Sequence, residues 1–181
     1  RKESSAASDV YKRQLVDEDG NVIGQASRKE CHSGSKLLHP VIHLHIFNSK
    51  GELYLQKRSA TKDIQPNKWD SSVGGHIDLG ETPEIAAKRE AREEIGLQDV
   101  TIHFIQKYII ETDRERELTY CFYSISNETP HADMNEVTDG RFWNISEIAD
   151  QLGKDIFTPN FELDFKHFLN SGIDNLLEKY K

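Results

Sequence analysis

The chain has 181 residues, enough for one domain with a substantial core, and 30% of them are charged. Its net charge of −8 disfavours a protein that binds duplex nucleic acid, because such proteins normally carry a basic surface. The two cysteines form no zinc-binding or disulfide pattern, and the apolar runs are too short to span a membrane. We therefore expect a cytoplasmic protein with no membrane partner.

The start of the chain differs in composition from the rest. It is rich in Ser and Ala and has no hydrophobic period. We expect residues 1–14 to be a non-native or disordered segment and residues 15–181 to form a single domain.

Strands and helices follow with regular signals. Strands are predicted at 15–16 and 21–26 around a turn at 17–20, then at 41–47, 52–58, 69–75, 98–111, 117–126 and 139–143. The strand at 69–75 should run into a Gly-Gly turn. Helices are predicted over 83–95, 146–152 and 159–170. The last helix has an apolar stripe suited to the core or a lid, with a homodimer contact as an alternative: Phe161, Phe165, Phe168 and Leu169. This mixture indicates an α+β or α/β domain.

The stretch GHIDLGETPEIAAKREAREEIGL, residues 75–97, contains the candidate chemistry. Thr82 is a suitable N-cap, Pro83 suits the first helical position, and Gly96 suits the residue after the last turn. These three signals define a helix over 83–95.

Three glutamates, Glu90, Glu93 and Glu94, fall within an arc of about 100° on that helix. They repel one another and lie late in the helix, where the macrodipole disfavours carboxylates. Arg89 offsets only part of this through its pair with Glu93. A hard divalent cation would relieve the repulsion, and oxygen ligands favour Mg²⁺ or Mn²⁺ over zinc. A solvated acidic face is the alternative that helix geometry alone leaves open.

The spacing G-x5-E-x7-R-E-A-x-E-E-x-G-L resembles the Nudix box, with every defining position filled. The resemblance implies an α+β fold of the Nudix type, an α/β/α sandwich with a mixed β-sheet flanked by helices. It also implies metal-dependent hydrolysis of a diphosphate linkage. The residue roles it implies are metal binding by Glu90, Glu93, Glu94 and a backbone carbonyl near Gly74, catalysis by Glu93, Glu94 and Arg89, and a structural role for Glu81.

The flanking sequence, from about residue 28 to 143, is similar to type I isopentenyl diphosphate isomerase. The similarity includes His32, His39, Phe47-Asn48, Lys57-Arg58, Lys62, Pro66, Trp69, Gly75-His76 and Gly80-Glu81. It implies a second metal site made by His32, His39, His76, Glu115 and Glu117. It also implies diphosphate contacts from Arg28, Arg58 and Lys62.

Plainer interpretations stand beside these. His32 and His39 fall in a predicted loop and would then be surface residues, and Glu115 and Glu117 would form a solvated hairpin tip, although Glu117 starts a strand that could face the site. Arg58 and Lys62 would be ordinary surface cations. We expect His43 and His45 to line a solvated sheet face, and Trp69 to pack rather than stack on a base. These are the alternatives that a structure must separate.

Two departures count against isomerisation. Gly74 stands where the isomerase has a cysteine, two residues before the histidine matching His76, and Glu90 stands where its box has Arg. We therefore expect a metal-dependent pyrophosphohydrolase acting on a nucleoside diphosphate derivative or a related small organic diphosphate. The isomerase and a non-catalytic Nudix-fold sensor are the alternatives. The substrate is expected to be chosen by loops outside the box.

Overall fold

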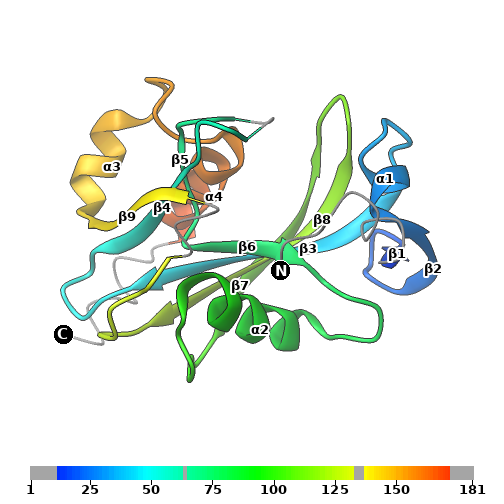
Figure 1. Ribbon diagram of the computed structural model, residues 1–181, viewed down its shortest axis with the longest axis horizontal. Coiled ribbons are helices and arrows are strands. Elements are labelled where there is room, and N and C mark those ends of the chain that lie inside the picture. Colours follow the sequence, from blue (N-terminus) through cyan, green and yellow to red (C-terminus); the bar gives the residue numbers. More distant parts are fainter. Residues whose placement is uncertain (1–11, 63–64, 133–136, 172–181) are drawn as a thin grey trace.

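A mixed β-sheet of seven strands organises the fold (Figure 1). The computed structural model describes residues 12–62, 65–132 and 137–171. The elements in chain order are β1 (Lys12–Val16), β2 (Val22–Ser27), α1 (Arg28–Cys31), β3 (Leu38–Phe47), β4 (Leu53–Arg58), β5 (Trp69–Asp70), β6 (Val73–His76), α2 (Pro83–Ile95), β7 (His103–Glu111), β8 (Arg116–Ile125), β9 (Val137–Trp143), α3 (Ile145–Gln151) and α4 (Pro159–Ser171).

Strand β3 lies at the centre of the sheet. It pairs in parallel with β8 along its whole length and antiparallel with β6 and β4. The sheet continues from β8 to β7 on one side and from β4 to β5 and β9 on the other. Strands β1 and β2 form a separate antiparallel hairpin. The parallel pairing brings the start of β8 beside the start of β3.

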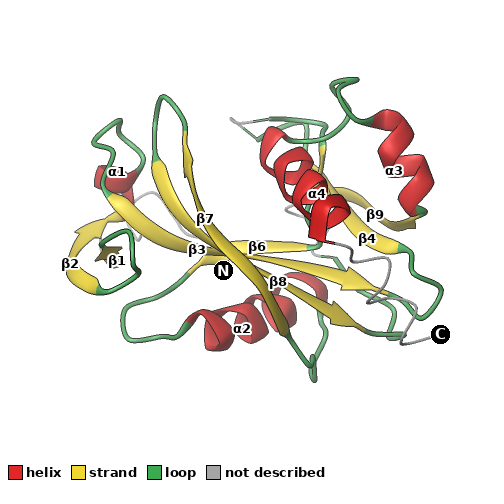
Figure 2. Cartoon of the chain, turned by 180° about the vertical axis from the view of Figure 1, so that it is seen from behind, coloured by secondary structure: helices red, strands yellow, loops and turns green. Residues whose placement is uncertain are grey.

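Helices cover both faces of the sheet (Figures 1 and 2). On one face, Ile42, Leu44 and Ile46 of β3 pack in one cluster with Ala87 and Ala91 of α2. On the other face a second cluster brings the aromatic residues of α4 together with α3 and two tryptophans: Phe161, Phe165, Phe168, Ile148, Trp69 and Trp143. The expected α+β sandwich, a mixed sheet flanked by helices, is confirmed.

Helix α2 has the predicted bounds because its end signals act locally. The Thr82 side chain accepts a hydrogen bond from the backbone N–H of Ile85 at 3.3 Å, and Pro83 opens the helix. Gly96 ends it in the left-handed conformation, with φ of 73°, which favours glycine. Ala86, Ala87 and Ala91 are fully buried. Their small side chains let the helix lie close to the sheet.

The Gly-Gly pair does not form the turn that the sequence suggested. The structure divides the predicted strand at 69–75 into β5 and β6, and Gly74 and Gly75 lie inside β6, paired with His43 and Ile42. Tertiary packing explains this difference. Strand β6 pairs with the edge of β3, and the two glycines, which have no side chains, leave room for α2. The last-helix stripe is confirmed as core at Phe161, Phe165 and Phe168.

The expectation that residues 1–14 form a non-native or disordered segment is wrong for Lys12–Gln14. Lys12–Gln14 belong to β1, and both Arg13 and Gln14 are buried. Arg13 donates to the Asp78 carboxylate at 2.8 Å, and the Gln14 amide donates to the Asp78 backbone carbonyl at 2.6 Å. Residues 1–11 lie outside the described part of the chain. No helix in the described part is both long and apolar enough to cross a membrane.

Candidate functional site

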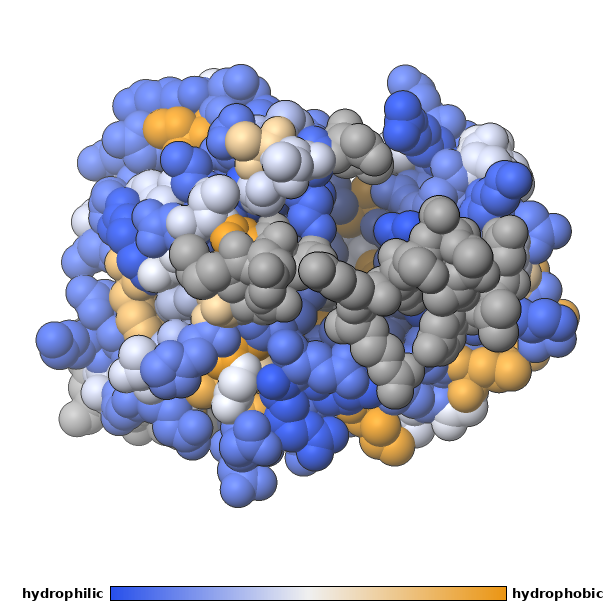
Figure 3. Space-filling view, in the orientation of Figure 1, coloured by the Kyte–Doolittle hydropathy of each residue, from blue (hydrophilic) through white to orange (hydrophobic). Residues whose placement is uncertain are grey.

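A cavity of about 1290 Å³ opens between strand β6, the N-terminal end of α4, the β7–β8 turn and the acidic face of α2. Twelve of the thirteen candidate site residues from the sequence line it, and His39 is buried behind it. The surrounding face of the molecule is mainly hydrophilic (Figure 3). The structure therefore brings both sets of sequence-predicted residues to one space.

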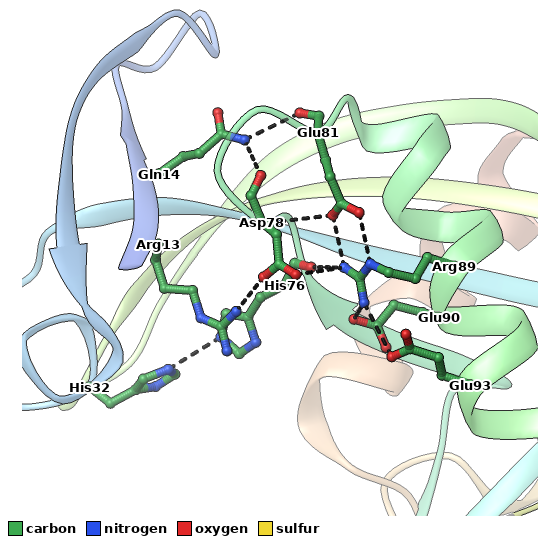
Figure 4. A network of polar contacts seen from close by, with 9 residues as sticks. All are labelled: Arg13, Gln14, His32, His76, Asp78, Glu81, Arg89, Glu90 and Glu93. Carbon is green, nitrogen blue, oxygen red and sulfur yellow. Dashed lines mark hydrogen bonds and ion pairs between the residues drawn. The ribbon is translucent and has the colours of Figure 1, made fainter. Parts of the chain in front are cut away.

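Arg89 is the centre of the polar network in Figure 4. Its guanidinium donates to both carboxylate oxygens of Glu81, at 2.8 and 2.9 Å, and to Oε1 of Glu90 at 2.7 Å. It also donates to the backbone carbonyl of His76 at 3.0 Å and lies 3.5 Å from Glu93. The bond to Glu81 raises the pKa of Arg89, so this charge is permanent. Arg89 thus ties α2 to the loop that precedes it.

Glu81 is held on both sides. Besides Arg89, its Oε2 accepts a hydrogen bond from the backbone N–H of Asp78 at 3.0 Å. The hydrogen bonds from Arg89 lower the pKa of Glu81. With both oxygens engaged, this carboxylate positions the loop.

Glu90 lies directly against the backbone of β6. A Cβ atom placed on Gly75 would sit 2.4 Å from both Cδ and Oε1 of Glu90. Sterics therefore explain why the box begins with glycine, since only a residue without a side chain lets Glu90 approach the strand. Burial raises the pKa of Glu90, although Arg89 opposes this.

Glu94 is the most deeply placed of the three glutamates. One of its oxygens lies 3.4 Å from the backbone N–H of Gly74 and 3.4 Å from the Gln56 amide. Burial, followed by repulsion from Glu90, raises the pKa of Glu94 to about 8. Two neighbouring carboxylates that resist ionisation are poised for a cation, because a bound divalent ion reverses both effects.

The second set of predicted ligands also comes together. His32, His39 and His76 offer ligand atoms within 4.8 Å of one another, and so do His39, Glu115 and Glu117. The Nε2 atoms of His32 and His76 are 3.2 Å apart (Figure 4), and Nδ1 of His32 contacts Glu115. We call these five residues the His/Glu cluster.

The expectation that His39 lies in a surface loop is wrong. It lies in β3 with no exposed surface, opposite Glu117 of β8 in the parallel pairing. Its Nδ1 donates to the backbone carbonyl of Leu37 at 3.0 Å, so in the neutral ring the lone pair is on Nε2. That Nε2 is 3.7 Å from Glu117 and has no hydrogen-bond partner among the described residues. A metal-ligating histidine is commonly fixed in this way.

The basic residues predicted to contact diphosphate line the same cavity. Arg28 begins α1, while Arg58 and Lys62 lie at the end of β4 and in the loop after it. Arg58 forms an ion pair with Asp70 at 3.2 Å. The cavity therefore carries cationic side chains as well as carboxylates, a combination that suits an anion bridged to the carboxylates by a metal.

Sequence reasoning missed a buried polar group on the α4 side of the sheet. His43 and His45 do not line a solvated face, because α4 covers it. Nδ1 of His43 donates to Oδ2 of Asp164 at 2.7 Å, and Nε2 of His45 lies 3.1 Å from the same oxygen. The Tyr108 hydroxyl contacts the other oxygen. The signal in the sequence was Asp164 itself, an acidic residue inside the apolar stripe of the last helix.

Charge pairing decides the protonation of this group. Burial disfavours the charged form of His43, but attraction to Asp164 and their hydrogen bond outweigh burial and raise the pKa of His43 to about 9. Burial also opposes ionisation of Asp164, yet the two histidines lower its pKa to about 2. The pair is therefore ionic near neutral pH.

Comparisons with known proteins agree with this architecture. A family model described as the NUDIX domain matches residues 37–161. An isopentenyl-diphosphate Delta-isomerase of Streptomyces griseus is 29% identical over 164 residues, covering 87% of this chain and 83% of the relative. An uncharacterised Nudix hydrolase of Yersinia pestis is 31% identical over 147 residues, covering 81% and 79%.

Solved structures show the same fold. A crystal structure of a Deinococcus radiodurans protein superposes with a TM-score of 0.73 at 24% identity, covering 86% of this chain and 97% of that one. A MutT protein of Methanosarcina mazei superposes with a TM-score of 0.63 at 20% identity, covering 76% and 95%. At these identities the likeness concerns the fold alone.

Proposed function

This chain belongs to the NUDIX family, and on that premise we propose that it is a metal-dependent hydrolase that cleaves the diphosphate linkage of a nucleoside diphosphate derivative or a related organic diphosphate. The observation that supports this most is the intact acidic face of α2, with Glu90 and Glu94 held against β6 by two glycines. We further propose that the protein acts in the cytoplasm.

The residues present fit a divalent metal. The glutamates of α2 offer hard oxygen ligands, and burial raises the pKa values of both Glu90 and Glu94, with repulsion from Glu90 adding to the shift at Glu94. In the proposed site Glu90, Glu93, Glu94 and the Gly74 carbonyl hold Mg²⁺ or Mn²⁺, and the His/Glu cluster holds a second ion. When bound, such ions neutralise phosphate oxygens and promote attack by water.

The other residues of the cavity would orient the metal ligands and bind the substrate. Arg89 keeps the Glu90 carboxylate in place through its bond at 2.7 Å, while Glu81 keeps Arg89 in place. Arg58, Lys62 and Arg28 would contact phosphate oxygens from the cavity wall, where a guanidinium forms two parallel hydrogen bonds and an ammonium acts as a point charge.

Isopentenyl diphosphate isomerisation is the second candidate. It is favoured by the assembled His/Glu cluster and by relatives named as isomerases. It needs one group to protonate carbon and another to remove a proton. Gly74 cannot supply the thiol expected at its position. Cys31 and Cys121 are buried and do not line the cavity, and burial raises the pKa of Cys121 to about 12. Hydrolysis is therefore the better-supported reaction.

One assay tests this ranking. The protein is incubated with Mg²⁺ and either a panel of nucleoside-diphosphate-linked compounds or isopentenyl diphosphate. We expect cleavage of at least one diphosphate linkage and no dimethylallyl diphosphate. No turnover of any compound would favour the non-catalytic sensor and contradict the proposal.

The second metal site has its own test. Mn²⁺ titration of the wild-type protein should show more than one bound ion per chain. His32→Ala should remove one class of Mn²⁺ sites. The Mn²⁺ affinity of the remaining class should stay unchanged, because the α2 glutamates are untouched. Identical titrations would refute a metal at the His/Glu cluster.

A further inference from the structure

We propose that His43 is a substrate-contacting residue of the cavity and that Asp164 positions its ring, so that Nδ1 is tied to Asp164 while Nε2 meets a phosphate oxygen of a bound diphosphate. This inference rests on the proposed function, since it names a contact for the same class of substrate in the same cavity.

The alternation of β3 places His43 at the cavity. His39, Val41, His43 and His45 share the sheet face opposite α2, because residues two apart along a strand point the same way. His43 lines the cavity with 12% of its side chain exposed, whereas the His45 side chain is fully covered. Two histidines on one strand thus share a carboxylate, and one of them faces the cavity.

The neighbours of His43 place it close to the α2 glutamates on one side and the His/Glu cluster on the other. In the sheet it pairs with Gly74 of β6, the residue whose N–H lies 3.4 Å from Glu94. His39 of the His/Glu cluster lies four residues earlier on the same face of β3. His43 therefore lies on the cavity wall beside Gly74 and on the same strand face as His39, where it could meet a diphosphate held by either group of ligands.

Asp164 fixes the orientation of the ring without reaching the substrate. Its side chain is fully buried on α4, and its oxygens are occupied by His43, His45 and Tyr108. With Nδ1 of His43 engaged at 2.7 Å, the other ring nitrogen has no hydrogen-bond partner among residues 12–62, 65–132 and 137–171. A histidine tied to a carboxylate through one nitrogen presents the second in a fixed direction.

Charge makes this direction useful. Carboxylates such as Glu90, Glu94 and Glu117 line the cavity, so a diphosphate needs cationic or donor groups beside them. Nδ1 of His43 is held by the buried Asp164 carboxylate at 2.7 Å, and a carboxylate behind one ring nitrogen supports a charge-assisted hydrogen bond that the other nitrogen donates to a phosphate oxygen. Asp164 is therefore a positioning residue, and His43 makes the contact.

The test uses methylene diphosphonate, a diphosphate analogue that is not hydrolysed, with Mg²⁺. Its Kd is measured by calorimetry for the wild type, His43→Asn and His43→Gln. The Asn amide can replace Nδ1 toward Asp164 but leaves nothing at the position of Nε2, whereas the Gln amide reaches that position. We expect binding about 10- to 100-fold weaker for His43→Asn, as for loss of a charged hydrogen bond, and partial recovery for His43→Gln.

His45→Asn is the matched control. It removes a second partner of Asp164 from the same strand but does not touch the cavity, so its Kd for the analogue should equal that of the wild type. Equal weakening in His45→Asn and His43→Asn would show that both act only through stability and would overturn the proposal. Unchanged binding in His43→Asn would also overturn it.

A measurement on the wild type covers variants that do not fold. The ¹⁵N resonance of the His43 Nε2 should shift when methylene diphosphonate and Mg²⁺ are added, while those of His45 should not. No shift at His43 refutes the contact. If the wild type binds the analogue but hydrolyses no panel compound, the proposed function is refuted, while the His43 contact can still be tested by binding. Failure of the proposed function is therefore distinguishable from failure of the His43 contact. No binding at all by the wild type would overturn both.

Discussion

Replacing Gly75 with alanine should disable the proposed metal site by displacing one glutamate. The new Cβ atom would sit 2.4 Å from Cδ and Oε1 of Glu90 and 2.6 Å from its Cγ. Carbon atoms pack at about 3.5–4.0 Å, so the Glu90 carboxyl must retreat by roughly 1 Å. That shift breaks its 2.7 Å bond to Arg89. Displacement of a ligand and its support on this scale corresponds to a loss of about 10- to 100-fold in metal affinity.

The control for this variant is the neighbouring glycine. A Cβ atom on Gly74 would have its nearest neighbours at 3.9 and 4.0 Å, which is ordinary contact, and alanine keeps the backbone groups of that residue. Neither glycine has positive φ, so backbone strain does not separate them. Mn²⁺ titration and kcat/KM should show a loss for Gly75→Ala and little change for Gly74→Ala. Equal behaviour of the two variants would refute the steric account of the box glycine.

Three further outcomes follow from the site. Glu94→Gln should lower hydrolysis at least about 100-fold, measured at limiting Mg²⁺, because charge stabilisation by the metal is worth several kcal/mol; near-normal turnover would contradict its role as a ligand. Arg58→Ala should raise KM by about 5- to 150-fold, equivalent to about 1–3 kcal/mol, with unchanged Mn²⁺ affinity, and Arg58→Lys should recover part of it; unchanged KM would contradict a phosphate contact from Arg58. His43→Asn should destabilise the protein in EDTA more at pH 6.5 than at pH 9. The pKa of His43 is raised from 6.5 to about 9 in the folded state, and this adds at most about 3 kcal/mol to the free energy of unfolding. That contribution is complete below pH 6.5 and is lost as the pH rises through 9. Parallel melting curves of wild type and variant across this range would refute the ion pair.

The features that the sequence predicted well depend on neighbours along the chain. Helix α2 has its predicted bounds because Thr82, Pro83 and Gly96 act within one turn of its ends. The acidic face follows from the helical period alone. The grouping of the His/Glu cluster depended on similarity to the isomerase, because the pairing of β3 with β8 that joins His39 to Glu117 is not a local property.

The features that were missed depend on tertiary packing. Gly74 and Gly75 satisfy a local rule for turns, yet pairing with β3 holds them in a strand. His43 and Asp164 are 121 residues apart, and their contact exists only because α4 packs on the sheet. Similarly, Arg13 and Gln14 looked like part of an unstructured start, but contacts with Asp78 bury them.

Turnover in ¹⁸O-labelled water with Mg²⁺, followed by analysis of the phosphorus products, tests hydrolysis of a diphosphate linkage most directly. We expect cleavage of at least one nucleoside-diphosphate-linked compound, with one ¹⁸O atom in a phosphate product, and no dimethylallyl diphosphate from isopentenyl diphosphate. Formation of dimethylallyl diphosphate without cleavage of any diphosphate linkage would contradict it, and would mean that a group other than a thiol at position 74 moves the proton.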